Sequence, residues 1–99
     1  MAKKKDNSKI QKYKDEVVQV FLKISKNQKL FTEFLSDILT PSEFKSVSLR
    51  WQIIKRLSKG ETHRFIAKEL GIGISTVTRG SRELEDPNGA FSKIFKKSK

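Results

Sequence analysis

The chain has 99 residues and a mass of 11.4 kDa, a size that fits one domain and excludes multidomain enzymes and large α/β folds. Its 22 basic and 11 acidic residues give a net charge of +11, which favours a polyanionic partner, nucleic acid before an acidic membrane surface. Cysteine is absent, which excludes disulfides, thiolate catalysis and cysteine-ligated zinc. Apolar residues make up only 35% of the chain, so we expect oligomerisation to complete the core.

Residues 1–14 carry the densest positive charge. They contain six lysines and one aspartate, and a composition so poor in apolar residues is typical of a disordered arm. Such an arm suits non-specific contacts with phosphates, although a solubilising tail would have the same composition. No signal-peptide pattern follows, and no apolar run approaches the roughly 18 residues of a membrane-spanning helix. We therefore expect a cytoplasmic protein without a membrane partner.

Residues 15–58 have the periodicity of helices and are predicted to form a helical dimerisation core. Apolar side chains recur at helical spacing from Val17 to Ile24, and again from Leu30 to Leu39 after a polar break at residues 25–27. Both stretches are apolar over much of their circumference, so each needs more than one neighbouring helix to cover it.

A third helix is predicted to begin at Pro41, which suits the first helical position, with Thr40 as its cap and Glu43 completing a capping box. Gly60 is well placed to end this helix after Ser58. One side of the helix carries apolar residues, namely Phe44, Val47, Trp51, Ile54 and Leu57.

Residues 59–84 predict a helix-turn-helix head that reads DNA, with helices over 61–70 and 74–84. Ala67 supplies the small residue over which the second helix crosses, and Gly71, four positions later, tolerates a positive φ in the turn. The second helix begins with short polar side chains able to reach base edges. Gly80 is unusual inside a helix, and it indicates close approach of a ligand or of another helix. An ordinary helical hairpin is the alternative interpretation.

Residues 85–99 predict a C-terminal turn, centred on Asp86-Pro87-Asn88-Gly89, and a short helix over residues 90–97. No segment alternates with the period of a strand. The fold class is therefore all-α, with about six short helices.

Three segments resemble the Trp operon repressor family of tryptophan-responsive helix-turn-helix proteins. They are Leu39-Thr40-Pro41-Ser42-Glu43, Ser48-Leu49-Arg50 and the run from Gly71 to Ser81 that ends in Thr-Val-Thr-Arg-Gly-Ser. The resemblance covers about residues 15–97. It implies an intertwined helical homodimer that represses transcription by binding double-stranded operator DNA, with L-tryptophan as corepressor. The family is itself a known example of water-mediated base contacts.

The resemblance also implies the site residues. Arg50 and Arg79 would sandwich the indole, and Arg79 would pair with the ligand carboxylate. Main-chain carbonyls near Asp37, Leu39 and Thr40 would hold the ammonium, and the remaining ligand positions are Thr76, Gly80 and Glu83. The positions that match DNA contacts are His63, Arg64, Lys68, Gly71, Ile72, Ile74, Ser75, Thr76, Thr78 and Arg82.

Four features depart from the family pattern. The turn between Gly60 and Thr62 is one residue shorter than in the best-known members. Glu83 replaces a serine, and its carboxylate would either repel the ligand carboxylate or attract the ligand ammonium. Asp37 replaces a leucine and could also bind the ammonium. Trp51 replaces a smaller aliphatic residue and could narrow or partly fill the ligand site.

No set of residues supports catalysis or metal binding. His63 is the only histidine, so a histidine-based triad or a histidine-rich metal site lacks partners. We therefore predict a repressor activated by L-tryptophan, without other cofactors. One alternative is an orphan helix-turn-helix regulator of the same fold that does not respond to tryptophan. A more remote alternative is a basic module that binds RNA or a membrane surface.

Overall fold

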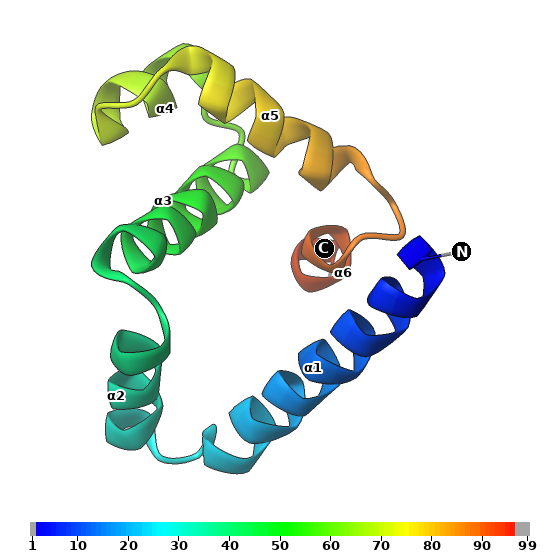
Figure 1. Ribbon diagram of the computed structural model, residues 1–99. Coiled ribbons are helices and arrows are strands. Elements are labelled where there is room, and N and C mark those ends of the chain that lie inside the picture. The colour runs from blue at the N-terminus through cyan, green and yellow to red at the C-terminus, as the bar shows by residue number, and fades with distance from the viewer. Residues whose placement is uncertain (1, 97–99) are drawn as a thin grey trace. The chain divides into compact units, whose positions relative to one another are not determined.

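The structure, a computed structural model, describes residues 2–96, with side chains for residues 8–95. Over this range the chain contains six helices and no strand, which confirms the predicted all-α class (Figure 1). The helices are α1 (Ala2–Ile24), α2 (Gln28–Ile38), α3 (Pro41–Ser58), α4 (His63–Leu70), α5 (Ile74–Glu85) and α6 (Ala90–Lys96). None of the helices in this part of the chain is long and apolar enough to span a membrane. The chain divides into two compact units, Met1–Pro41 and Ser42–Lys99.

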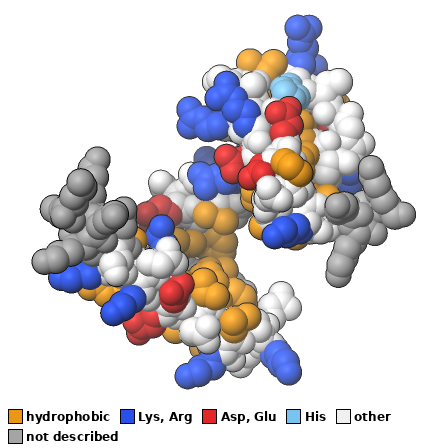
Figure 2. Space-filling model, turned by 90° about the vertical axis from the view of Figure 1, so that its right-hand side faces the viewer, with side chains coloured by type: hydrophobic (Ala, Val, Ile, Leu, Met, Phe, Trp, Pro, Cys, Tyr) orange, Lys and Arg blue, Asp and Glu red, His pale blue; other side chains and the backbone are white. Residues whose placement is uncertain are grey.

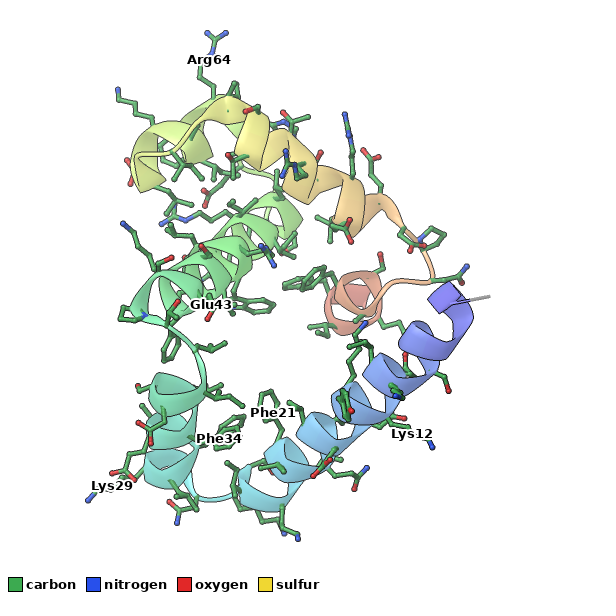
Figure 3. The ribbon with its side chains drawn as sticks, viewed as in Figure 1. Lys12, Phe21, Lys29, Phe34, Glu43 and Arg64 are labelled. Carbon is green, nitrogen blue, oxygen red and sulfur yellow. The ribbon has the colours of Figure 1, made fainter. Side chains whose placement is uncertain are left out.

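The first unit is a pair of helices, α1 and α2, joined by aromatic contacts. The ring of Phe21 lies 5.3 Å from that of Phe31 and 5.8 Å from that of Phe34, so rings from both helices face one another (Figure 3). Asn27 caps α2, because its side chain accepts a hydrogen bond of 3.1 Å from the backbone N–H of Leu30.

Large apolar side chains remain exposed on this unit. None of the side chains described for residues 8–41 is buried, and hydrophobic groups gather on the surface in the lower part of Figure 2. Tyr13 is 60% exposed and Leu22 is 64% exposed. Two helices therefore cannot cover their own apolar faces, as the sequence pattern of residues 15–39 predicts.

Helix α1 begins at Ala2, so residues 2–14 are helical where the composition predicts a disordered arm. Lysine is a good helix former. One turn is also bridged by a side-chain hydrogen bond of 3.0 Å, which the amide of Gln11 donates to the carboxylate of Asp15. The basic segment is thus continuous with the apolar part of the same helix.

The second unit has its core where α3, α4 and α5 meet. Ile53, Ile66 and Val77 form a buried cluster there, and Leu57, Ala67, Leu70 and Ile72 pack against it. Within the predicted apolar side of α3, Ile54 is buried, but Val47 and Trp51 are exposed. The prediction of which face of α3 is buried is therefore only partly correct, because the face that packs toward α4 and α5 is centred on residues 53 and 54.

Two glycines make the turns that the sequence predicts. Gly60 ends α3 with a φ of 89°, and Gly71 follows α4 with φ 68° and ψ 38°. These left-handed conformations strain residues that carry a Cβ atom, which explains the glycines. The backbone N–H of Ile72 then donates to the carbonyl oxygen of Ala67 at 3.0 Å, which closes the turn of the helix-turn-helix.

The short connection between α3 and α4 is held by an ion pair and a cap. The guanidinium of Arg56 lies 3.2 Å from the carboxylate of Glu61, and the Thr62 hydroxyl accepts a hydrogen bond of 3.1 Å from the N–H of Phe65. Because Thr62 is the cap, α4 begins at His63, slightly later than the predicted residue 61.

Helix α6 packs against α3 and against the end of α5. The ring of Phe95 stacks on Trp51, with centroids 5.5 Å apart and an interplanar angle of 17°. The Ser92 hydroxyl lies 2.9 Å from the carbonyl oxygen of Leu84 and 2.6 Å from that of Asp86. These contacts fix the short C-terminal helix beside the second unit's core.

Candidate ligand pocket and nucleic-acid interface

An open pocket of about 500 Å³ lies between α3, α5 and α6 in the second unit. Five of the eight predicted ligand residues line it: Arg50, Thr76, Arg79, Gly80 and Glu83. Arg50 lies on α3 and the other four lie on α5. The sequence could assign each of these residues to a ligand site, but only the structure shows that they line one pocket. The rest of the lining is Ser46, Leu49, Ile53, Ile54, Ile72 and Phe91.

The other three predicted ligand residues, Asp37, Leu39 and Thr40, belong to the first unit. Asp37 lies in the last turn of α2, and Leu39 caps that helix by donating its N–H to the carbonyl oxygen of Leu35 at 3.0 Å. The pocket is described within the second unit alone, where residues from Ser46 to Phe91 line it. The expected role of Asp37, Leu39 and Thr40 in holding an ammonium stays a prediction.

The pocket combines an apolar wall with charged groups. Ile53, Ile54 and Phe91 contribute apolar surface, while Arg50, Arg79 and Glu83 are exposed charged residues in the same lining. Among the described residues, neither arginine nor Glu83 takes part in an ion pair. Such a site suits a ligand that has both an apolar part and charged groups.

Gly80 has a packing role that the sequence left open. A Cβ atom at this position would lie 2.7 Å from the Cγ2 atom of Ile53, which is too close for a real contact. The absence of a side chain therefore lets α5 approach α3. Because Gly80 also lines the pocket, the same close approach shapes the candidate ligand site.

Sequence reasoning missed part of the pocket. Ser46, Leu49 and Ile53 share a face with Arg50 at helical spacing, a signal that was present in the sequence. Phe91 has no such local signal, because its place depends on how α6 folds back. Trp51 is absent from the lining and stacks on Phe95 instead, so the expected filling of the ligand site by its ring is not observed.

Helix α5 presents an exposed surface that combines an isoleucine with hydroxyl and guanidinium groups. Ile74 and Ser75 are exposed, and a surface hollow is lined by Ile74, Ser75, Thr78, Arg79 and Arg82. Arg64 projects from α4 away from α5 (Figure 3), and other Lys and Arg side chains project from this unit in the upper part of Figure 2. The exposed Lys68 lies on the same short helix as Arg64.

His63 links the two helices of this surface. Its Nδ1 atom lies 3.4 Å from the Thr78 hydroxyl oxygen, and that hydroxyl also lies 3.1 Å from the carbonyl oxygen of Ile74, to which it donates. Because the Thr78 hydroxyl donates its hydrogen to Ile74, its oxygen can only accept a hydrogen bond from His63. The contact therefore requires the form of the imidazole that carries a hydrogen on Nδ1. This contact orients two of the predicted DNA-binding residues.

Two of the residues predicted to bind DNA also contribute to the fold. Gly71 forms the turn, and the side chain of Ile72 packs against the core and lines the ligand pocket. Ile72 therefore connects the interior of the helix-turn-helix with the candidate ligand site.

Comparison with known proteins identifies the family. The family model described as Trp repressor protein matches residues 13–99. The Trp operon repressor homolog of Vibrio vulnificus is 42% identical over 65 residues, which are 65% of this chain and 64% of that protein. The corresponding homolog of Chlamydia trachomatis serovar D is 40% identical over 85 residues, 80% of this chain and 88% of that protein.

The homolog of Vibrio campbellii is 40% identical over 76 residues, 74% of this chain and 75% of that protein. The chain thus spans just under two thirds of the Vibrio vulnificus relative and most of the chlamydial one. The match of the family model covers α1 from residue 13 onward and the whole of α2 to α6. This chain belongs to the Trp repressor family, a family of DNA-binding regulators and not of enzymes.

Proposed function

We propose that this protein is a sequence-specific transcriptional repressor that binds operator DNA as a homodimer and is activated by L-tryptophan. One observation carries the proposal. The pocket that gathers Arg50, Thr76, Arg79, Gly80 and Glu83 is formed partly by α5, the helix whose exposed residues Ile74 and Ser75 are proposed to reach DNA. A ligand in this pocket would therefore act directly on the placement of the recognition helix.

The ligand would bind with its indole against the apolar wall, between the guanidinium groups of Arg50 and Arg79. Arg79 would pair with its carboxylate, since a guanidinium can donate two parallel hydrogen bonds to a carboxylate. Main-chain carbonyls near Asp37, Leu39 and Thr40, at the end of α2, would supply acceptors for the ammonium. The bound ligand would hold α5 at a fixed distance from α3 and so reduce the freedom of the DNA-reading head.

DNA would be contacted by both helices of the head. Arg64 and Lys68 on α4, together with His63, would bind phosphates, and Arg82 would add charge on α5. Base edges would be reached from α5, directly or through water, by Ile74, Ser75, Thr76 and Thr78. Two heads on a homodimer would enter successive major grooves, about 34 Å apart. The exposed apolar surface of α1 and α2 supports the dimer.

The proposal is tested by measuring operator affinity with and without L-tryptophan. Candidate duplexes would first be selected from a random pool, and their affinity would then be measured by fluorescence anisotropy against a scrambled duplex. We expect a sequence preference that strengthens on addition of L-tryptophan, together with saturable binding of one ligand per chain by calorimetry. Equal affinity for selected and scrambled duplexes would reject the repressor and favour a basic RNA- or membrane-binding module.

A second candidate is an orphan regulator that binds DNA specifically without tryptophan. Glu83 supports this candidate, because its carboxylate lines the pocket and would repel the carboxylate of a ligand bound nearby. In that case the selected duplex would bind tightly, and millimolar L-tryptophan would produce neither heat nor a change in DNA affinity. The two candidates therefore differ only in the ligand measurement.

The lysines at the N-terminus are expected to strengthen DNA binding without regard to sequence. Replacing Lys3, Lys4 and Lys5 by glutamine should lower affinity for selected and scrambled duplexes by similar factors. It should also reduce the slope of log affinity against log salt, by about 0.9 for each phosphate that the variant no longer neutralises. The matched control replaces Lys23, Lys26 and Lys29, which removes the same charge elsewhere. If both triple variants have the same slope, the N-terminal lysines make no specific phosphate contacts.

A further inference from the structure

We infer that Phe91 on α6 is a further ligand-contact residue of the pocket, and that the stack of Phe95 on Trp51 positions it. The part of the ligand that Phe91 would receive is a flat aromatic ring. The inference rests on the proposed function, because it adds an aromatic wall to the proposed ligand pocket. Neither the sequence pattern nor the family resemblance assigns a residue of α6 to the ligand.

Phe91 brings an aromatic ring to a pocket that α3 and α5 otherwise form. Among the described residues of α6, Phe91 alone lines the pocket, and its side chain is half-buried there. The apolar side chains of the remaining lining are aliphatic, namely Leu49, Ile53, Ile54 and Ile72. Two aromatic rings in an offset-stacked or edge-to-face arrangement gain more than their buried area accounts for. An aromatic ligand would therefore gain from Phe91 a contact that the aliphatic wall does not provide.

The last turn of α6 is tied to α3 by a second aromatic residue. Phe95 follows Phe91 by four residues, so the two rings lie on the same side of the helix. The ring of Phe95 stacks on Trp51 with centroids 5.5 Å apart and an interplanar angle of 17°, which is an offset-stacked arrangement. Trp51 directly follows Arg50, a residue of the pocket lining. The stack therefore holds the side of α6 that carries Phe91 against the helix that carries Arg50.

The first turn of α6 is tied to the end of α5. The Asp86 carboxylate accepts a hydrogen bond of 3.0 Å from the N–H of Asn88, and its carbonyl oxygen accepts one of 3.0 Å from the N–H of Gly89. The Ser92 hydroxyl lies 2.9 Å from the carbonyl oxygen of Leu84. Contacts at both ends thus fix α6, and loss of the Phe95 ring would release its last turn. Phe91 would then line the pocket for a smaller fraction of the time.

The contact between Phe91 and the ligand is tested with L-tryptophan and with indole, which has the ring system alone. Calorimetry would measure both ligands on the intact protein and on Phe91→Ala. We expect both affinities to fall about fivefold, by similar factors, because the lost contact is with the ring. Phe91→Leu, which keeps an apolar side chain without a ring, replaces the alanine variant if that variant does not fold. The control is Ile94→Ala on the same helix, because Ile94 is 52% exposed and outside the lining; it should change neither affinity.

The positioning role of Phe95 is tested by a double-mutant cycle. Phe95→Leu should weaken L-tryptophan binding about threefold in the intact background and have no further effect in the Phe91→Ala background, because Phe95 acts through Phe91. Phe95→Tyr keeps an aromatic ring and should retain the affinity within about twofold. Trp51 is the single tryptophan of the chain, so its fluorescence without ligand reports whether the stack is present. Additive losses in the cycle would reject the positioning role.

The two ligands separate failure of this inference from failure of the proposed function. If Phe91→Ala binds both ligands as tightly as the intact protein does, the inference is overturned and the corepressor proposal stands. A loss for L-tryptophan with unchanged indole binding would also overturn it, since the contact would not be with the ring. Indole binding that depends on Phe91, without binding of L-tryptophan, would reject the corepressor and support the aromatic wall. If neither ligand binds the intact protein, both proposals are rejected.

Discussion

Replacing Arg79 with leucine is expected to abolish ligand-dependent DNA binding while leaving the oligomeric state unchanged. Arg79 lines the pocket beside Thr76, Gly80 and Glu83, and its guanidinium is the group proposed to pair with the ligand carboxylate. Leucine keeps an apolar stem but offers no hydrogen-bond donor, so the carboxylate would be left without a partner. We expect ligand affinity to fall by more than about tenfold, since hydrogen bonds to charged groups are worth about 1.5–3 kcal/mol.

Arg79 also lines the surface hollow of α5, so its loss can weaken DNA binding directly. Ligand affinity must therefore be measured by calorimetry without DNA, and the oligomeric state by sedimentation. Arg82→Leu is the matched control, because Arg82 lines the hollow but not the ligand pocket. That variant should lose DNA affinity and keep ligand affinity. Unchanged ligand binding by Arg79→Leu would reject the assigned role of Arg79.

Replacing Gly80 with valine is expected to destabilise the second unit and to prevent ligand binding. Even a single Cβ atom would lie 2.7 Å from Ile53 Cγ2, and Ile53 is 3% exposed, so it has little room to move. Overpacking of this kind typically costs about 1–3 kcal/mol. The gain in helix propensity on removing a glycine is only about 1 kcal/mol, so the steric cost is the larger effect. The free energy of unfolding would be measured with urea.

A double-mutant cycle identifies the steric overlap that causes the destabilisation. Ile53→Leu removes the Cγ2 branch at nearly constant volume, so Gly80→Ala should be better tolerated in that background than in the intact protein. Equal costs in both backgrounds would show that the overlap with Ile53 is not the reason for the glycine. If Gly80→Ala were more stable than the intact protein, the inference that Gly80 is needed for the close approach of α5 to α3 would be rejected.

The local features of this fold could be predicted from the sequence. Pro41 begins α3, and Gly60 and Gly71 adopt the positive φ that their turns require. These features depend on a few neighbouring residues, so local conformational preferences decide them. The largest differences at helix ends are the early start of α1, where the lysine-rich composition indicates disorder, and the late start of α4, where Thr62 caps the helix.

From the sequence, five of the pocket's residues could be predicted to bind a ligand. Each of these predictions came from a match between one position and the family pattern. The sequence could not show that Arg50 and Arg79 share a pocket with Phe91, which lies 41 residues from Arg50. Nor could it show that Trp51 stacks on Phe95 instead of filling the pocket. Such contacts depend on which helices pack together and at what distance.

By itself, therefore, the sequence determined the helical class, the turns, the basic charge and the types of residue available for binding DNA and a ligand. The tertiary structure decided which face of α3 is buried, why position 80 has no side chain and which charges line the same pocket. The physical reason is that helix formation is governed by hydrogen bonds and side chains within a few residues. The shape of a pocket, by contrast, is set by steric contacts between helices that are distant in the chain, such as that between Gly80 and Ile53.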